Sequence, residues 1–166
     1  MFKKLLIALA IILPMSCFAQ KFGSVNFEEV FNAMPERQAA EAQLAEASKK
    51  YETEFQKLQE ELQKLYTDYQ TIQNDPNTPD TIKERRMQEI QDRGANVEKF
   101  YQTAQQDLQR QQDQLMAPVQ QKLVDAITAV GQEGNFTAII AQGQFLYQGN
   151  DVTDVTSLVK AKLGIQ

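Results

Sequence analysis

The residue types that most often carry enzyme chemistry are scarce in this chain. Its 166 residues contain no histidine, no tryptophan and a single cysteine, Cys17, which lies in the apolar N-terminal stretch. Without histidine or a second cysteine, the usual zinc sites and the Ser-His or Cys-His catalytic arrangements cannot be built. Carboxylates, lysines, tyrosines and hydroxyls remain, but their spacing does not indicate an active site. We therefore expect that the protein is not an enzyme and uses no metal and no cofactor.

The first 19 residues have the layout of a secretory signal peptide. Two lysines precede an apolar run over residues 5–13, and a small-x-small site follows at Cys17 and Ala19. The apolar run is too short to span a bilayer as a stable helix. We expect cleavage after Ala19, which would leave an exported chain without cysteine. A lipid-anchored N-terminus at Cys17 is the alternative.

The charge balance argues against a nucleic-acid partner. The full chain has 17 basic and 22 acidic residues, and removal of the two lysines of the signal peptide leaves 15 basic residues against 22 acidic ones. The longest basic cluster is KERR at residues 83–86, which we interpret as a solvated helix face. Charges of both signs are interspersed along the two long segments, as on exposed helices.

Two long segments carry the heptad spacing of coiled-coil helices. In the first segment, apolar residues recur at alternating spacings of four and three, and we call this stripe the first seam. A second, weaker seam follows after a proline-rich stretch. The first consists of Tyr51, Phe55, Leu58, Leu62, Leu65, Tyr69 and Ile72, and the second of Met87, Ile90, Gly94, Val97, Tyr101, Ala104, Leu108, Gln111 and Leu115. We predict a first helix over residues 36–73, preceded by Pro35, a residue favoured at helix starts.

The stretch IQNDPNTPD, residues 72–80, predicts a sharp turn between the two helices. We expect Thr78 to cap the second helix and Pro79 to lie in its first turn. The result is an antiparallel helical hairpin whose tip spans residues 74–80, in which facing residue numbers sum to about 154. Pro118 should kink the returning helix near the base of the hairpin.

The remaining residues predict a small β-rich body built from both ends of the exported chain. Its expected elements are a strand at 21–27, a helical turn at 28–34, a helix at 119–130, strands at 135–142 and 144–149, and a last helix capped by Asp151-Val152-Thr153. The fold class is thus α+β and mostly α. Its parts are the signal peptide (1–19), the body (20–34 with 119–166) and the coiled-coil hairpin (35–118).

Size and open sheet edges predict a homo-oligomer. A body of about 63 residues buries a small fraction of its surface, and three short strands leave edges that natural proteins cover or pair. Association with further copies of the same chain solves both problems. We assign to the association body the apolar residues Val25, Phe27, Ile139, Ile140, Leu146 and Tyr147.

The order of these features resembles the Skp/OmpH family of periplasmic chaperones over the whole exported chain. The opening VNFEEVFNAMPE, the heptad hairpin and APVQQKLVDAITAV carry the likeness. The C-terminal block GNFTAIIAQGQFLYQGNDVTDVTSLVKAKLG is the most specific part. It places Asn135-Phe136 at the start of a strand, Leu146-Tyr147 at a strand end and Asp151-Val152-Thr153 before the last helix.

This resemblance implies a jellyfish-like homotrimer in the periplasm. Its hairpins would project as tentacles around a cavity and hold unfolded outer-membrane β-barrel proteins without ATP. The family is described as cationic, whereas residues 60–95 of this chain hold eight acidic and five basic side chains. Electrostatic capture of clients and lipopolysaccharide binding are therefore open questions. A weak contact with the membrane is the one further partner that we consider.

Apolar residues that lie off the seams or near the tip are the candidates for client binding. They are Tyr66, Phe100 and Met116 off the seams, and Tyr69, Ile72 and Met87 near the tip. Two other interpretations stay open. One is a scaffolding coiled coil of the cell envelope that holds no client. The other, more distant, is a carboxylate enzyme that uses Asp151 or Asp154.

Overall fold

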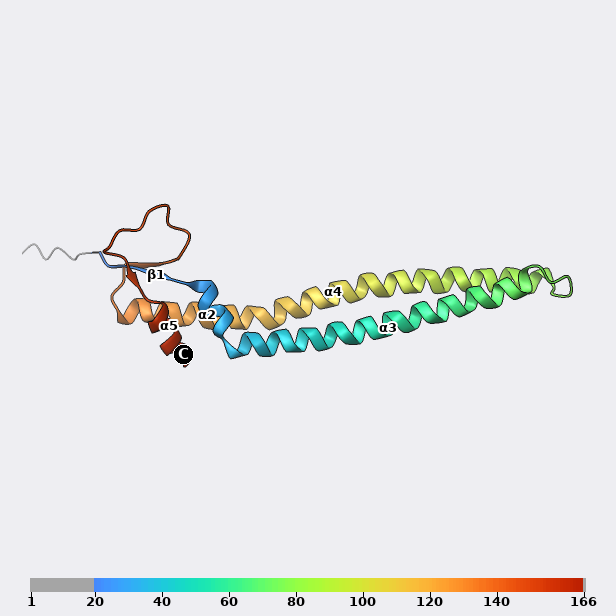
Figure 1. Ribbon diagram of the computed structural model, residues 1–166, viewed down its shortest axis with the longest axis horizontal. Coiled ribbons are helices and arrows are strands. Elements are labelled where there is room, and N and C mark those ends of the chain that lie inside the picture. Colours follow the sequence, from blue (N-terminus) through green and yellow to red (C-terminus); the bar gives the residue numbers. More distant parts are fainter. Residues whose placement is uncertain (1–19, 166) are drawn as a thin grey trace, which may run out of the picture. The chain divides into compact units, whose positions relative to one another are not determined.

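Two long helices make up most of the structure, a computed structural model that describes residues 20–165 (Figure 1). In chain order the elements are β1 (Phe22–Val25), α2 (Phe27–Ala33), α3 (Pro35–Gln73), α4 (Asp80–Glu133), β2 (Ala138–Ala141), β3 (Thr153–Asp154) and α5 (Thr156–Leu163). The chain divides into two compact units. We call residues 28–125 the helical unit, and residues 20–27 with 126–164 the sheet unit. The expected signal peptide lies outside the described residues.

In the helical unit, contacts at three levels show that α3 and α4 run in opposite directions (Figure 1). Glu36 at the start of α3 pairs with Lys122 of α4. Further along, the Tyr51 hydroxyl donates to Asp107. Glu61 then meets Arg93, with a carboxylate oxygen 3.6 Å from the guanidinium nitrogen. The numbers of this last pair sum to the predicted value of 154, and those of the other two differ from it by four.

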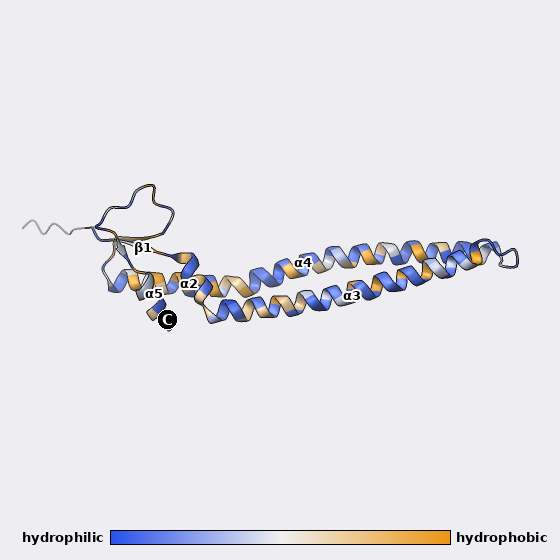
Figure 2. Cartoon of the chain, viewed as in Figure 1, coloured by the Kyte–Doolittle hydropathy of each residue, from blue (hydrophilic) through white to orange (hydrophobic). Residues whose placement is uncertain are grey.

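The seams mark the sides of α3 and α4 that are withdrawn from solvent. All seven residues of the first seam are half-buried, and the residues between them are exposed except for Glu61. On α4, Ile90, Val97 and Ala104 are buried at intervals of seven residues, as a heptad requires. Figure 2 shows the same mixture, with hydrophobic bands interspersed among hydrophilic ones along both helices. Two helices alone thus leave much of the apolar stripe open to solvent.

Tyr101 was predicted to lie in the second seam, but it is less buried than a seam residue should be, with 45% of its surface exposed. Its ring lies against Phe55 of α3, with ring centroids 5.4 Å apart. The adjacent Phe100, expected off the seam, lies against Tyr51 at 6.1 Å. Two consecutive residues of α4 therefore share the contact with α3, and neither is fully covered.

Asp75 organises the turn between the two helices. One of its carboxylate oxygens accepts hydrogen bonds from the backbone and side-chain nitrogens of Asn77, and the other accepts from the Thr78 hydroxyl. Our prediction that Thr78 caps α4 was therefore wrong, since its hydroxyl points back to the turn. The carbonyl of Pro79 instead accepts the first backbone hydrogen bonds of α4, from Ile82 and Lys83.

Pro118 lies inside α4, which continues to Glu133. The separate helix predicted over residues 119–130 is thus the C-terminal part of one long helix. Around this level the helical unit has its best-packed core. Val30, Met34 and Leu123 are fully buried there.

The sheet unit contains a three-stranded parallel sheet in the order β2-β1-β3. Phe22 pairs with Ala138 on one side of β1, and Gly23 pairs with Thr153 on the other. The strand predicted at 144–149 is absent, because those residues form an irregular loop that follows a turn at residues 142–143. β2 and β3 occupy both edges of β1, and the loop pairs with neither of them as a strand.

α4 ends in a Schellman motif, in which two backbone bonds close the last turn. The Phe136 nitrogen donates to the Gly131 carbonyl and the Asn135 nitrogen donates to that of Gln132. Asn135 adopts a positive φ of 53°, which asparagine tolerates better than most residues. The chain therefore leaves the helix at Asn135 rather than at a glycine, and enters β2 three residues later.

The start of α5 depends on Asp154 rather than on Asp151, which corrects the predicted cap. A carboxylate oxygen of Asp154 accepts from the Thr156 backbone nitrogen at 2.9 Å and from its hydroxyl at 2.6 Å. The same hydroxyl accepts a hydrogen bond from the Asn26 backbone nitrogen. This network joins α5 to the segment after β1, and Val155 and Val159 are fully buried beside it.

Candidate functional site

Four aromatic rings gather where the middle of α3 faces α4 in the helical unit. Tyr51 lies against Phe100, and Phe55 lies against Tyr101. These side chains reach each other because positions 51 and 55 lie one turn apart on one helix face. Between the rings is a pocket of about 190 Å³, which we call the aromatic pocket. It is lined by Ser48, Tyr51, Glu52, Phe55, Phe100, Tyr101, Ala104, Gln105 and Leu108.

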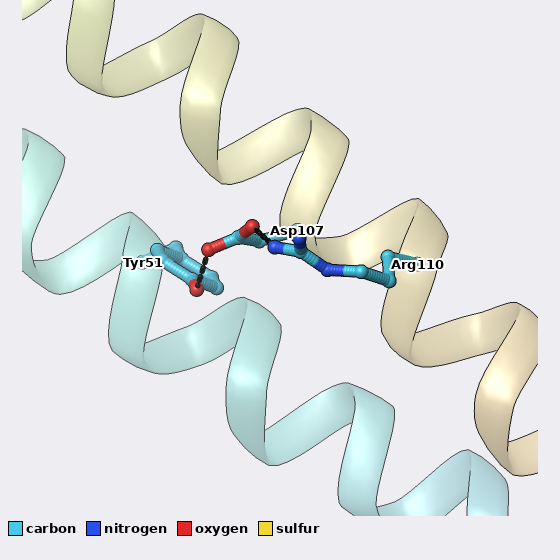
Figure 3. Close-up of polar contacts among 3 residues, drawn as sticks. All are labelled: Tyr51, Asp107 and Arg110. Atoms are coloured by element: carbon cyan, nitrogen blue, oxygen red, sulfur yellow. Dashed lines mark hydrogen bonds and ion pairs between the residues drawn. The ribbon is translucent and has the colours of Figure 1, made fainter.

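A polar contact holds one wall of this pocket (Figure 3). The Tyr51 hydroxyl donates to a carboxylate oxygen of Asp107 at 3.0 Å, and the other oxygen of Asp107 pairs with Arg110. Figure 3 shows that Tyr51 reaches from α3 to Asp107 on α4, while Arg110 lies on the same helix as Asp107. The tyrosine ring is therefore positioned by α4 as well as by its own helix.

Two further hollows lie along the helical unit and contain predicted client-binding residues. Tyr66 is 46% exposed and lines a hollow of about 540 Å³ together with Leu62 and Val97. Tyr69 and Met87 line another of about 440 Å³ near the turn. The glutamines and charged residues that complete both linings make these hollows more polar than the aromatic pocket.

The structure brings together some of the predicted client-binding residues and separates others. Tyr69 and Met87 line the same hollow, Tyr66 is exposed, and Phe100 is a wall of the aromatic pocket. Ile72 and Met116 are half-buried and line none of the three hollows.

Sequence reasoning missed the pocket because it assigned Tyr51, Phe55 and Tyr101 to seams and left Phe100 outside them. The predicted helix pairing could have revealed the pocket. Facing residue numbers that sum to about 154 place residues 51–55 opposite residues 100–101. Four aromatic residues at those positions predict a cluster too wide for two helices to cover.

The residues assigned to the association body are spread over the sheet unit. Val25 is buried within the sheet, whereas Phe27, Ile139 and Ile140 are half-buried. Leu146 and Tyr147 lie in the loop after β2, and both are fully or almost fully exposed. Two adjacent large apolar side chains in water form a surface that this chain does not itself cover.

Several carboxylates have lowered pKa values because hydrogen bonds favour their charged form. The hydrogen bond from Lys122 lowers the pKa of Glu36. At the turn, the Asn77 backbone and the Thr78 hydroxyl lower the pKa of Asp75. In the sheet unit, the Thr156 side chain and backbone lower the pKa of Asp154. These carboxylates stabilise turns, helix starts and helix pairing, and each is already engaged in that structural contact.

Within residues 20–165, no helix is long and apolar enough to cross a membrane. The same residues contain no group of three or more histidines, cysteines or carboxylates placed to hold a metal ion.

Comparison with known protein families matches the chain to Outer membrane protein (OmpH-like) over residues 21–163. No curated protein sequence matches the chain. The family match covers both units that the structure describes and agrees with the resemblance found in the sequence. The chain therefore belongs to the OmpH-like family.

Proposed function

We propose that the protein is an ATP-independent holding chaperone of the periplasm that keeps unfolded outer-membrane proteins from aggregating. Membership of the OmpH-like family supports the general role, because this is a family of periplasmic chaperones rather than of enzymes. In the proposed mechanism, residues 35–118 form a coiled-coil arm and residues 20–34 with 119–166 form an association body. Three arms together enclose the client.

The observation that carries this proposal is the incomplete burial of the apolar stripe between α3 and α4. The seven residues of the first seam are all half-buried, and Tyr66 and Tyr101 are exposed beside them. Such an arm offers many shallow apolar contacts and no deep, closed site. Many weak contacts bind an unfolded chain firmly enough to prevent aggregation, yet allow it to leave without ATP.

The sheet unit supports association into a trimer. Among the described residues, β2 pairs with β1 on one side only, so its outer edge is free for a strand of another copy. Leu146 and Tyr147 present apolar surface in the loop that follows β2. We propose that residues 144–149 pack against a neighbouring body in the trimer.

Clients are expected to contact the arm at Tyr66, Tyr69, Ile72, Met87, Phe100 and Met116. The arm has carboxylates as well as lysines and arginines along both helices, as in the pairs Arg37–Glu41 and Arg86–Glu89. We therefore expect apolar contact, rather than attraction by net positive charge, to supply most of the client binding.

The test is light scattering after a urea-unfolded outer-membrane barrel protein is diluted into buffer with increasing amounts of this protein. We expect scattering to be suppressed near three chains per client, with no ATP present. Protein that is folded and oligomeric but leaves scattering unchanged at every ratio would refute the chaperone function and favour a scaffolding role.

The oligomeric state is tested separately by sedimentation of a Leu146→Asp variant. Leu146 is fully exposed in the single chain, so this change leaves the chain's own core intact and should shift the trimer toward monomers. Tyr66→Asp is the matched control in the helical unit and should remain trimeric. Equal sedimentation of both variants would exclude Leu146 from the association surface.

A further inference from the structure

The aromatic pocket differs from the other hollows of the helical unit in size and chemistry. Its volume of about 190 Å³ is close to the roughly 150 Å³ of an engineered apolar cavity that binds benzene. Four rings, Ala104 and Leu108 form most of its lining, and polar groups of Ser48, Glu52 and Gln105 complete it. A pocket of this kind fits a single aromatic ring and is too small for a folded element.

The negative charge of Glu52 at the aromatic pocket favours an occupant that carries a positive charge next to its aromatic ring. Within the described part of the chain, Lys50 pairs with Glu46 and Arg110 with Asp107, whereas no ion pair engages Glu52. Glu52 is exposed, so its carboxylate is available to a positive group beside an aromatic one. A carboxylate beside the pocket therefore favours segments with a basic residue next to the aromatic one over segments without it.

Resting on the function proposed above, we propose that the aromatic pocket binds one aromatic side chain of an extended client segment that has a basic residue beside it, facing Glu52. Transmembrane β-strands carry aromatic girdles near both membrane interfaces, so an unfolded outer-membrane protein presents such side chains repeatedly. Ring against ring packing within 4.5–7 Å is favourable, and the rings already present show that spacing. The pocket thus supplies one site of preferred side-chain identity along an otherwise unselective arm.

The absence of tryptophan from the chain allows a direct binding assay. The probe is a soluble ten-residue peptide with alternating polar residues, one tryptophan and a lysine on each side of it. Its fluorescence can be excited selectively, and burial in an apolar pocket should shift its emission to shorter wavelength. A peptide with alanine in place of tryptophan should fail to compete with the probe.

Two variants with the same introduced side chain test the location. Ser48→Phe places a ring into the pocket from its rim and should weaken probe binding at least about fivefold, the size of one lost aromatic contact. Thr53→Phe introduces the same ring on α3 away from the pocket lining and should stay within about twofold of the unmodified protein. Circular dichroism checks that both remain folded. If Ser48→Phe is misfolded, Tyr101→Ala removes one wall instead and should also weaken binding.

The charge requirement has its own test. Glu52→Gln should weaken the lysine-flanked probe by about threefold and leave a serine-flanked probe unchanged. Equal probe affinity in the unmodified protein, Ser48→Phe and Tyr101→Ala would overturn the pocket assignment. In that case the scattering assay still decides the chaperone function, because suppression by the unmodified protein does not depend on a single pocket. Loss of suppression by the unmodified protein would instead refute the function itself.

Discussion

Ile90 is the large apolar residue that α4 buries most completely in the helical unit beyond its base, with 1% of its surface exposed. Arg93, three residues on, pairs with Glu61, so Ile90 lies where α4 faces the outer part of α3. Replacement of Ile90 by alanine removes three carbon groups, worth about 0.8 kcal/mol each on burial, or roughly 2.4 kcal/mol. Two helices close readily around a small void, which places the total near the lower end of the 2–5 kcal/mol range for such changes, about 2.5 kcal/mol.

Hydrogen exchange measured by mass spectrometry reports this loss locally, which matters because two units need not unfold together. A change of about 2.5 kcal/mol corresponds to roughly 60-fold faster exchange of amides near residue 90. Amides of β1 in the sheet unit should exchange at an unchanged rate. The proposed client-holding activity should fall by a smaller factor than the local protection from exchange, because the exposed apolar surface is retained.

Leu62→Ala is the comparison variant, since Leu62 lies in the first seam but is only half-buried. Leu62→Ala should lower the local stability by about half as much, roughly 1.2 kcal/mol, and so accelerate amide exchange nearly tenfold. If the two variants accelerate exchange equally, or if Ile90→Ala accelerates it less than tenfold, burial in the single chain does not determine the stability of this region.

Three further changes test contacts in both units. Asp154→Ala removes the carboxylate that accepts from Thr156 and should cost about 1 kcal/mol at pH 7 in urea unfolding. Because the pKa of Asp154 is lowered in the folded protein, its contribution is present above about pH 4 and is lost as the pH falls through that lowered pKa, so the difference from the unmodified protein should shrink as the solution is acidified below about pH 4. Gly134→Ala would place a methyl group against the ring two residues on and should cost roughly 1–3 kcal/mol, seen as a lower midpoint of thermal unfolding; an unchanged midpoint would contradict the packing. Tyr51→Phe removes the bond to Asp107 and should cost about 0.5–1 kcal/mol by the same measurement, whereas a larger loss would mean that the hydroxyl does more than bridge the helices.

The helices were predictable because their signals are local and repeated. Pro35 opens α3, and the residues around Asp75 end it, so the bounds of α3 agree with the prediction within one residue. Seam residues recur over many turns, and each one adds to the same conclusion. The carboxylate that supports the start of α5 had no such repeated signal, since Asp151 and Asp154 are equally suitable by residue type. Pairing of Ser24 with Asp154 places Asp154 next to the helix start.

The strand predicted at 144–149 failed for a different reason. Its aromatic and apolar residues favour a strand, but Leu146 and Tyr147 are exposed in the single chain, so burial against this chain's own sheet does not stabilise one. Composition indicates a preference for strand and not the surface against which that strand would pack. The aromatic pocket was missed similarly, because the heptad rule assigns Tyr101 to the seam and excludes its neighbour, whereas both Phe100 and Tyr101 contact α3.

The position of β1 at the centre of the sheet has a consequence for the order of folding. Its two partners come from the other end of the chain, and the bond from the Asn26 nitrogen to Thr156 spans 130 residues. Closing so long a loop is slow compared with pairing the neighbouring helices, whose contacts grow outward from the turn. A chain that emerges N-terminus first therefore keeps its first strand unpaired until nearly all of it has been delivered. The helical unit can form before the sheet unit, and the surface proposed to join the copies is completed last.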